Sequence, residues 1–145
     1  MTLSALQIAQ AYSVFANNGN FIELNLYDEF SFDIPLKERV ISEDTNKKIL
    51  DMLVEAVNSN RGTASKAKIK NRIVAGKTGT AKETLEENTT YTGTFAGFVP
   101  HKNPEFLAVV VLHGLSGEDY SGGKVSAPIF SNIMQQIFLM KDLKI

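Results

Sequence analysis

The hydrophobic period of the chain changes near residue 73, and this change restricts the possible folds more than any other feature. Before it, apolar residues recur at helical spacing over residues 4–17 and 43–58. After it, three segments alternate with the period of two that is typical of strands: residues 73–80, 92–99 and 106–113. Residues 126–141 return to a helical pattern. This order predicts an α+β fold, in which flanking helices cover a three-stranded antiparallel meander.

Local signals support several of these elements. Ser4 and Gln7 fit a capping box, in which a Ser hydroxyl and a Gln side chain each satisfy an unpaired amide. Ser42 precedes two acidic residues, as expected at the start of the second helix. Residues 21–35 are expected to hold short extended pieces, and residues 65–72 a helical turn or a solvated loop. The strand from residue 106 is apolar on both faces, which predicts an interior strand covered on both sides.

The composition excludes several classes of protein. With 145 residues the chain has the size of one domain. Its 15 basic against 16 acidic residues argue against a nucleic-acid-binding protein. The absence of Cys removes disulfides, Cys-bound zinc and thiol nucleophiles. No uninterrupted apolar run approaches the ~20 residues that span a bilayer, so a soluble globular piece is expected.

Gly-Lys-Thr at residues 76–78 resembles the end of a phosphate-binding loop. That motif needs a further glycine at position 71, where the chain has Asn71. It also needs a helix directly after it, and Gly79 with the charged residues beyond it disfavours one. A phosphate-binding NTPase is therefore a poor alternative, and a nucleotide-dependent shift in melting temperature would reveal it.

A Lys-Thr-Gly triplet on a strand has another meaning, because it occurs in serine acyl-transfer enzymes. Lys77 would direct a fixed positive charge toward a substrate carboxylate. Thr78 and Thr80 would place two hydroxyl donors on one strand face. Gly79 has no Cβ to obstruct a substrate lying alongside the strand, and the amide after it would serve as one oxyanion-hole donor. Alternatively, the triplet has no catalytic role and is part of an ordinary Thr-rich strand edge.

Four blocks of sequence resemble class B penicillin-binding proteins in content and in order. Residues 4–19 resemble the family's T-P-L-Q-x-A-x-A-Y helix, and residues 62–81 its G-T-A…V-A-G-K-T-G-T-A segment. Residues 95–104 resemble its A-G-F-V-P strand with the N-P turn, and residues 120–130 its Y-x-G-G-x-V-S-A-P-x-F helix entry. The last block favours the division-specific peptidoglycan D,D-transpeptidase within this family. The blocks cover nearly the whole chain.

The resemblance implies an incomplete serine D,D-peptidase/β-lactamase-like fold, with residues 1–145 as the C-terminal part of the transpeptidase domain. It implies a serine-type D,D-transpeptidase that cross-links peptidoglycan stem peptides in septal cell-wall synthesis and is acylated by β-lactams. Lys77 and Thr80 would then be catalytic, and Lys77, Thr78, Gly79 and Thr80 would bind substrate. No metal or cofactor is implied. The full-length protein would lie on the periplasmic side of the bacterial inner membrane, with divisome proteins as further partners and no nucleic acid.

The family's nucleophilic S-x-x-K and its S-x-N motif are expected upstream of the residue 4–17 helix. Ser65 and Lys68 match S-x-x-K formally, but they lie in a variable, Lys-rich stretch rather than at the start of a buried helix. We therefore expect that Ser65 is not the nucleophile and that the chain alone is inactive. A non-catalytic β-lactam sensor or binding module of the same fold is the alternative.

The resemblance also predicts an unpaired strand. In the family's five-stranded sheet, the strand that begins at Phe106 and ends at His113 lies beside an N-terminal strand that these residues do not supply. An open apolar edge exposes N–H and C=O groups and pairs readily with another chain. We expect the isolated chain to self-associate there or to be marginally stable.

Overall fold

The structure is a computed structural model that describes residues 3–24, 37–85 and 88–143. The three-stranded sheet has the order β3–β4–β5 and is antiparallel throughout, and β1 pairs with β2 in a second, two-stranded sheet. In chain order the elements are α1 (Ala5–Ala16), β1 (Asn20–Ile22), β2 (Lys37–Arg39), α2 (Glu43–Asn58), the 3-10 turn η1 (Ser65–Ala67), β3 (Ala75–Leu85), β4 (Asn88–Val99), β5 (Phe106–Leu115) and α3 (Gly122–Asp142). The predicted α+β order is confirmed, and β2 is an element that the sequence did not reveal.

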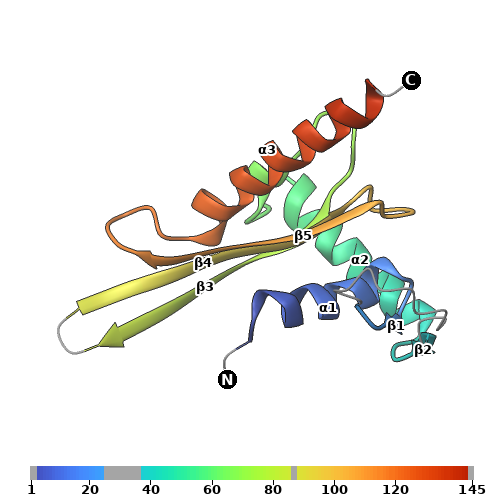
Figure 1. Ribbon diagram of the computed structural model, residues 1–145, viewed down its shortest axis with the longest axis horizontal. Helices are drawn as coiled ribbons and strands as arrows, with labels where there is room; N and C mark the ends of the chain where they lie inside the picture. The colour runs from blue at the N-terminus through green and yellow to red at the C-terminus, as the bar shows by residue number, and fades with distance from the viewer. Residues whose placement is uncertain (1–2, 25–36, 86–87, 144–145) are drawn as a thin grey trace, which may run out of the picture.

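The three-stranded sheet lies between two helical layers (Figure 1). On one face, Phe130 of α3 packs edge-to-face on Phe95 of β4, with ring centroids 4.7 Å apart. On the other face, Leu53 of α2 and Phe98 of β4 form a second cluster, against which Tyr12 of α1 packs. The sheet thus contributes to both clusters, because successive strand residues point to opposite faces.

The interior strand is β4, and the prediction that β5 is interior is wrong. Phe95, Phe98 and Val99 of β4 are fully buried, whereas the apolar side chains of β5 are only half-buried. Among the described strands β5 has one neighbour, so its side chains lack lateral contacts on one side. The expected cover of both its faces is confirmed, since Phe106 packs on the α3 side and Leu107 on the α1–α2 side.

The starts of α1 and α2 agree with the predicted capping residues, and the start of α3 does not. Ser4 and Gln7 form the capping box, and the Ser42 hydroxyl accepts a hydrogen bond from the Thr45 amide at 3.2 Å. The last helix begins at Gly122, earlier than the predicted start at Ser126, so that the helix contains Pro128. Contacts with the sheet determine this start, as described below.

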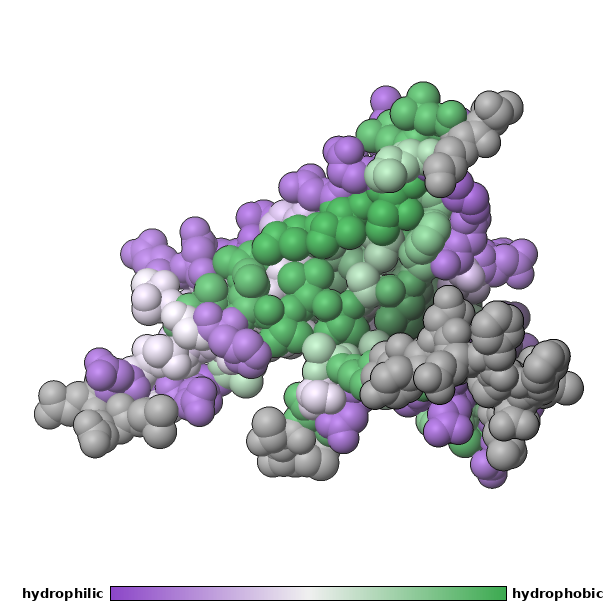
Figure 2. Space-filling view, in the orientation of Figure 1, coloured by the Kyte–Doolittle hydropathy of each residue, from purple (hydrophilic) through white to green (hydrophobic). Residues whose placement is uncertain are grey.

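The β3–β4 hairpin is longer than predicted and projects beyond the helical layers (Figure 1). Near the body of the molecule, apolar surface gathers along α3 and the sheet beneath it (Figure 2). Ile129, Ile133 and Met140 are, with Leu139, the exposed large apolar residues of α3. Of the extended pieces predicted at residues 21–35, Phe21 and Ile22 are confirmed in β1, and residues 25–35 lie outside the described residues. Within the described ranges, no helix combines the length and the apolar character needed to cross a bilayer.

Candidate functional site

The Lys-Thr-Gly-Thr segment lies in β3, at the free edge of the sheet. On one side β3 pairs with β4, so that Thr78 is opposite Phe95 and Thr80 is opposite Gly93. On its other side, β3 has no partner among the strands that the structure describes. The prediction that this segment is a strand is confirmed, and the outer backbone edge is open to an extended ligand.

Thr78 is held by hydrogen bonds on both sides of its hydroxyl. The Lys77 ammonium donates to the Thr78 carbonyl oxygen at 3.0 Å and to the Thr78 hydroxyl at 3.3 Å. The Thr78 hydroxyl donates in turn to the Thr63 hydroxyl at 3.2 Å. Because a hydroxyl carries a single hydrogen, this arrangement directs the Thr78 hydrogen inward and leaves the hydrogen of the exposed Thr63 hydroxyl free to donate outward.

Thr63 was not identified as a site residue from the sequence. It follows α2 in the turn that leads to η1, and it belongs to the G-T-A block. The only available signal was that block, which says nothing about which side chain Thr63 would contact. The Ala64 amide bonds the Ala56 carbonyl oxygen at 3.0 Å, and this bond fixes the turn against the end of α2.

Thr80 contacts the first turn of α3. The Gly122 amide donates to the Thr80 hydroxyl at 3.2 Å. Since the Thr80 oxygen accepts from this amide, its own hydrogen remains available for a ligand. The N-terminus of a helix carries a partial positive charge, so the hydroxyl is polarised in the sense that favours an anion.

Two glycines allow the start of α3 to approach the sheet and the Thr63 turn this closely. A Cβ on Gly122 would overlap the carbonyl oxygens of Thr94 and Gly79, and one on Gly123 would overlap the carbonyl oxygen of Thr63. Gly79 differs, because a Cβ there would meet only the Thr94 Cβ at an ordinary 3.7 Å. The packing of the chain therefore requires Gly122 and Gly123, but it does not require Gly79.

Charged side chains lie at the strand and beside the start of α3. Lys77 is exposed at the strand, and Lys124 forms a 2.9 Å ion pair with Asp119 beside the start of α3. The hydrogen bond from Lys124 lowers the pKa of the Asp119 carboxyl, and nearby Lys66 acts in the same direction. The same bond raises the pKa of the Lys124 ammonium. The exposed Lys77 ammonium at the strand itself carries a positive charge that suits an anionic ligand.

A stacked aromatic pair lies next to these groups. Tyr91 of β4 and Tyr120 have ring centroids 3.8 Å apart and ring planes inclined by 15°. Tyr120 precedes Ser121, the N-cap of α3, and Tyr91 is opposite Lys82 in the sheet. No local pattern predicts this pair, because Tyr91 lies in β4 and Tyr120 in the loop before α3.

The two formal S-x-x-K matches do not have the arrangement of an activated serine. Ser65 is exposed within the short turn η1. Ser121 and Lys124 give a second match that sequence reasoning missed, and Ser121 is the N-cap of α3. However, Lys124 is paired with Asp119, which raises the pKa of its ammonium, so it stays protonated and cannot accept a proton from a serine. In the described part of the chain, no group of three His, Cys, Asp or Glu side chains is placed to hold a metal ion.

Comparisons with known proteins give one consistent result. The model of the penicillin binding protein transpeptidase domain matches residues 1–135. A probable peptidoglycan D,D-transpeptidase of Neisseria flavescens is 31% identical over 137 residues, which cover 92% of this chain and 34% of that protein. The peptidoglycan D,D-transpeptidase FtsI of Escherichia coli is 33% identical over 138 residues, which cover 92% of this chain and 23% of that protein.

A solved structure resembles this fold closely. It is the apo TP domain of Burkholderia pseudomallei penicillin-binding protein 3, with a TM-score of 0.80 and 28% sequence identity. The match covers 99% of this chain and 43% of that one. The chain thus spans between about a quarter and a third of the two curated relatives, and less than half of the solved domain.

Proposed function

The chain belongs to the penicillin-binding protein transpeptidase family, and we propose that it supplies the substrate-binding strand of a peptidoglycan D,D-transpeptidase. In this proposal the substrate is the peptide stem of peptidoglycan, and β-lactams occupy the same site. Residues 1–145 are the C-terminal part of the transpeptidase domain, and the nucleophile comes from outside them.

The free edge of β3 is the observation that carries the proposal. An extended peptide can add to such an edge by main-chain hydrogen bonds. Gly79 leaves room for this approach, although nothing in the packing of the chain demands a glycine there. Thr80 directs a free hydroxyl hydrogen outward, and so does Thr63. A peptide that ends in a carboxylate can thus pair with the open strand edge, pass over Gly79, and accept hydrogen bonds from two free hydroxyl groups.

Each residue of the motif then has a role in acyl transfer. The serine supplied from elsewhere attacks the carbonyl of the penultimate D-Ala, the terminal D-Ala leaves, and an amine of a neighbouring stem takes the acyl group. The Thr80 amide serves as one donor to the oxyanion. Lys77 and the Thr80 hydroxyl bind the substrate carboxylate, while Thr78 connects Lys77 to Thr63.

The proposal extends to location and partners. We place the complete protein on the periplasmic side of the bacterial inner membrane, where it acts with divisome proteins during septal synthesis.

The isolated chain has an unpaired strand, because the outer edge of β5 has no partner in the described sheet. We propose that it self-associates through residues 106–113, which are apolar and carry no charge from Phe106 to Leu112.

The test uses the complete protein with Thr80→Val, which keeps the shape of the side chain and removes its hydroxyl. Charge-assisted hydrogen bonds contribute about 1.5–3 kcal/mol, so acylation by a fluorescent penicillin should slow by about tenfold or more. Thr84→Val is the matched control, because Thr84 lies on the same strand outside the motif. Equal acylation rates in the two variants would show that Thr80 is ordinary strand surface.

A further inference from the structure

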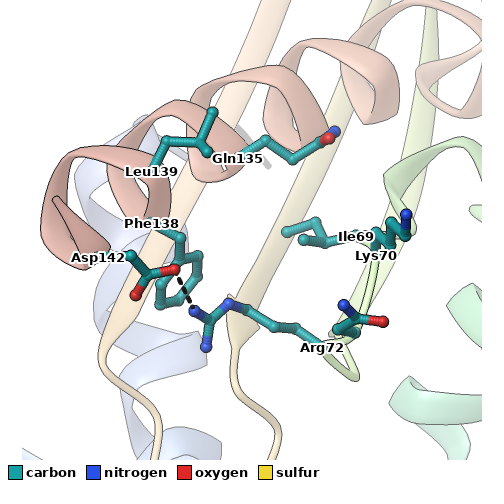
Figure 3. A pocket seen from close by; sticks show the side chains of 8 residues that line it. Ile69, Lys70, Arg72, Gln135, Phe138, Leu139 and Asp142 are labelled. Carbon is teal, nitrogen blue, oxygen red and sulfur yellow. Dashed lines mark hydrogen bonds and ion pairs between the residues drawn. The ribbon is translucent and has the colours of Figure 1, made fainter.

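A pocket lies at the far end of α3 from Thr80. It has a volume of about 400 Å³ and lies between residues 69–72 and the last two turns of the helix (Figure 3). A helix of this length spans about 30 Å, so the pocket is separate from the β3 edge. Its volume lies within the range of ligand sites in proteins.

The pocket combines an apolar floor with a cationic side. Ile69 and Phe138 are buried at its base, and Leu139 at its rim is 55% exposed. Lys70 and Arg72 contribute two positive charges, and Asp142 contributes one negative charge. The lining thus joins three apolar side chains to polar and charged ones, with one surplus positive charge.

Arg72 has a fixed orientation in this pocket. Its guanidinium carbon lies 3.7 Å from the centroid of the Phe138 ring, which is a cation–π contact. The Arg72 Nη2 also donates to the Asp142 carboxylate at 3.3 Å (Figure 3). The Arg72 side chain is 28% exposed and that of Asp142 is 65% exposed. The arginine is therefore held by the ring, whereas its carboxylate partner lies in solvent and can be displaced.

We propose that this pocket binds a partner-protein segment in which an acidic residue adjoins an apolar one. The incoming carboxylate replaces Asp142 on the Arg72 guanidinium, whose planar fork suits a bidentate carboxylate. The apolar side chain packs on Phe138 and Leu139 and covers the exposed leucine. Asp142 occupies the position of the ligand carboxylate until the partner arrives. Charge complementarity selects an acidic segment, and the apolar floor distinguishes it from a simple anion.

The test is an NMR titration of the full chain with N-acetyl-leucyl-glutamate methylamide, observing the amides of Asn71 and Gln135. N-acetyl-leucyl-glutamine methylamide is the matched control peptide. Asp142→Asn should tighten binding by about two- to fivefold, because it removes the internal competitor from an exposed ion pair. Arg72→Gln should abolish the difference between the two peptides.

Opposite effects of the two substitutions are the result that supports the proposal. Asp119→Asn, which alters an ion pair at the other end of α3, should leave binding unchanged. Equal affinity for the two peptides, or weaker binding in Asp142→Asn, would overturn the proposal. So would binding to phosphatidylglycerol vesicles that depends on Arg72 while the glutamate peptide causes no shifts. The peptide comparison and Asp142→Asn remain decisive if Arg72→Gln does not fold.

Discussion

The amide of Gly122 donates a hydrogen bond to the hydroxyl of Thr80 across 42 residues of sequence. This bond joins the start of the last helix to the strand at the free edge of the sheet. It has two consequences. The Thr80 hydroxyl can donate only away from the helix, toward a ligand at the edge. The approach also requires a residue without a side chain at position 122.

Gly122→Ala should therefore lower stability, whereas Gly79→Ala should slow acylation without lowering stability. In Gly122→Ala the new methyl group overlaps the carbonyl oxygens of Thr94 and Gly79, and such overpacking costs about 1–3 kcal/mol. In Gly79→Ala the methyl group meets an ordinary contact, so thermal stability should be unchanged while acylation of the complete protein slows. Calorimetry together with penicillin labelling measures both effects. A loss of stability in Gly79→Ala would show that this glycine serves the fold instead.

Thr63→Val should slow acylation without altering the motif itself. The substitution removes the oxygen that accepts the Thr78 hydrogen, and a neutral hydrogen bond of this kind contributes about 0.5–1.5 kcal/mol. We expect a decrease of about three- to tenfold in the acylation rate of the complete protein. Thr63→Ser keeps the hydroxyl and should restore the rate. If serine and valine give the same rate, the hydroxyl of residue 63 has no part in the site.

The isolated chain of 145 residues should not be labelled covalently by a fluorescent penicillin. Oxyanion donors and a binding edge cannot form an acyl-enzyme without an attacking group. Ser65 is exposed in a short turn, and Lys124, beside Ser121, is paired with Asp119. Mass spectrometry after incubation is the measurement. An adduct on Ser65 or Ser121 would refute both the proposed division of the active site and the reading of these serines.

The isolated chain should associate through β5. An unpaired edge with seven consecutive uncharged residues favours strand pairing between copies. Val111→Lys places a charge in this strand and should lower the apparent mass measured by light scattering at equal concentration. Thr84→Val, on the opposite edge, is the control. A wild-type chain that is monodisperse, monomeric and cooperatively folded would contradict the prediction.

Elements that depend on neighbouring residues are readable from the order of the amino acids alone. The start of α1 follows from Ser4 and Gln7, which satisfy each other's amides within one turn. The three strands follow from alternation with a period of two, and the lysine motif was placed on the correct strand. These features are readable because each rests on interactions between residues at most a few positions apart.

Which distant segments meet depends on long-range packing. The positions of Thr63 and Gly122 at the site depend on how α2 and α3 pack against β3, and no local pattern encodes that packing. A glycine carries no side chain whose periodicity could reveal a close approach, so the early start of α3 was missed. The predicted meander already placed β4 in the middle, but which of the two apolar strands is fully buried was decided by the order of pairing. Local chemistry thus fixed the elements, and long-range packing fixed the site.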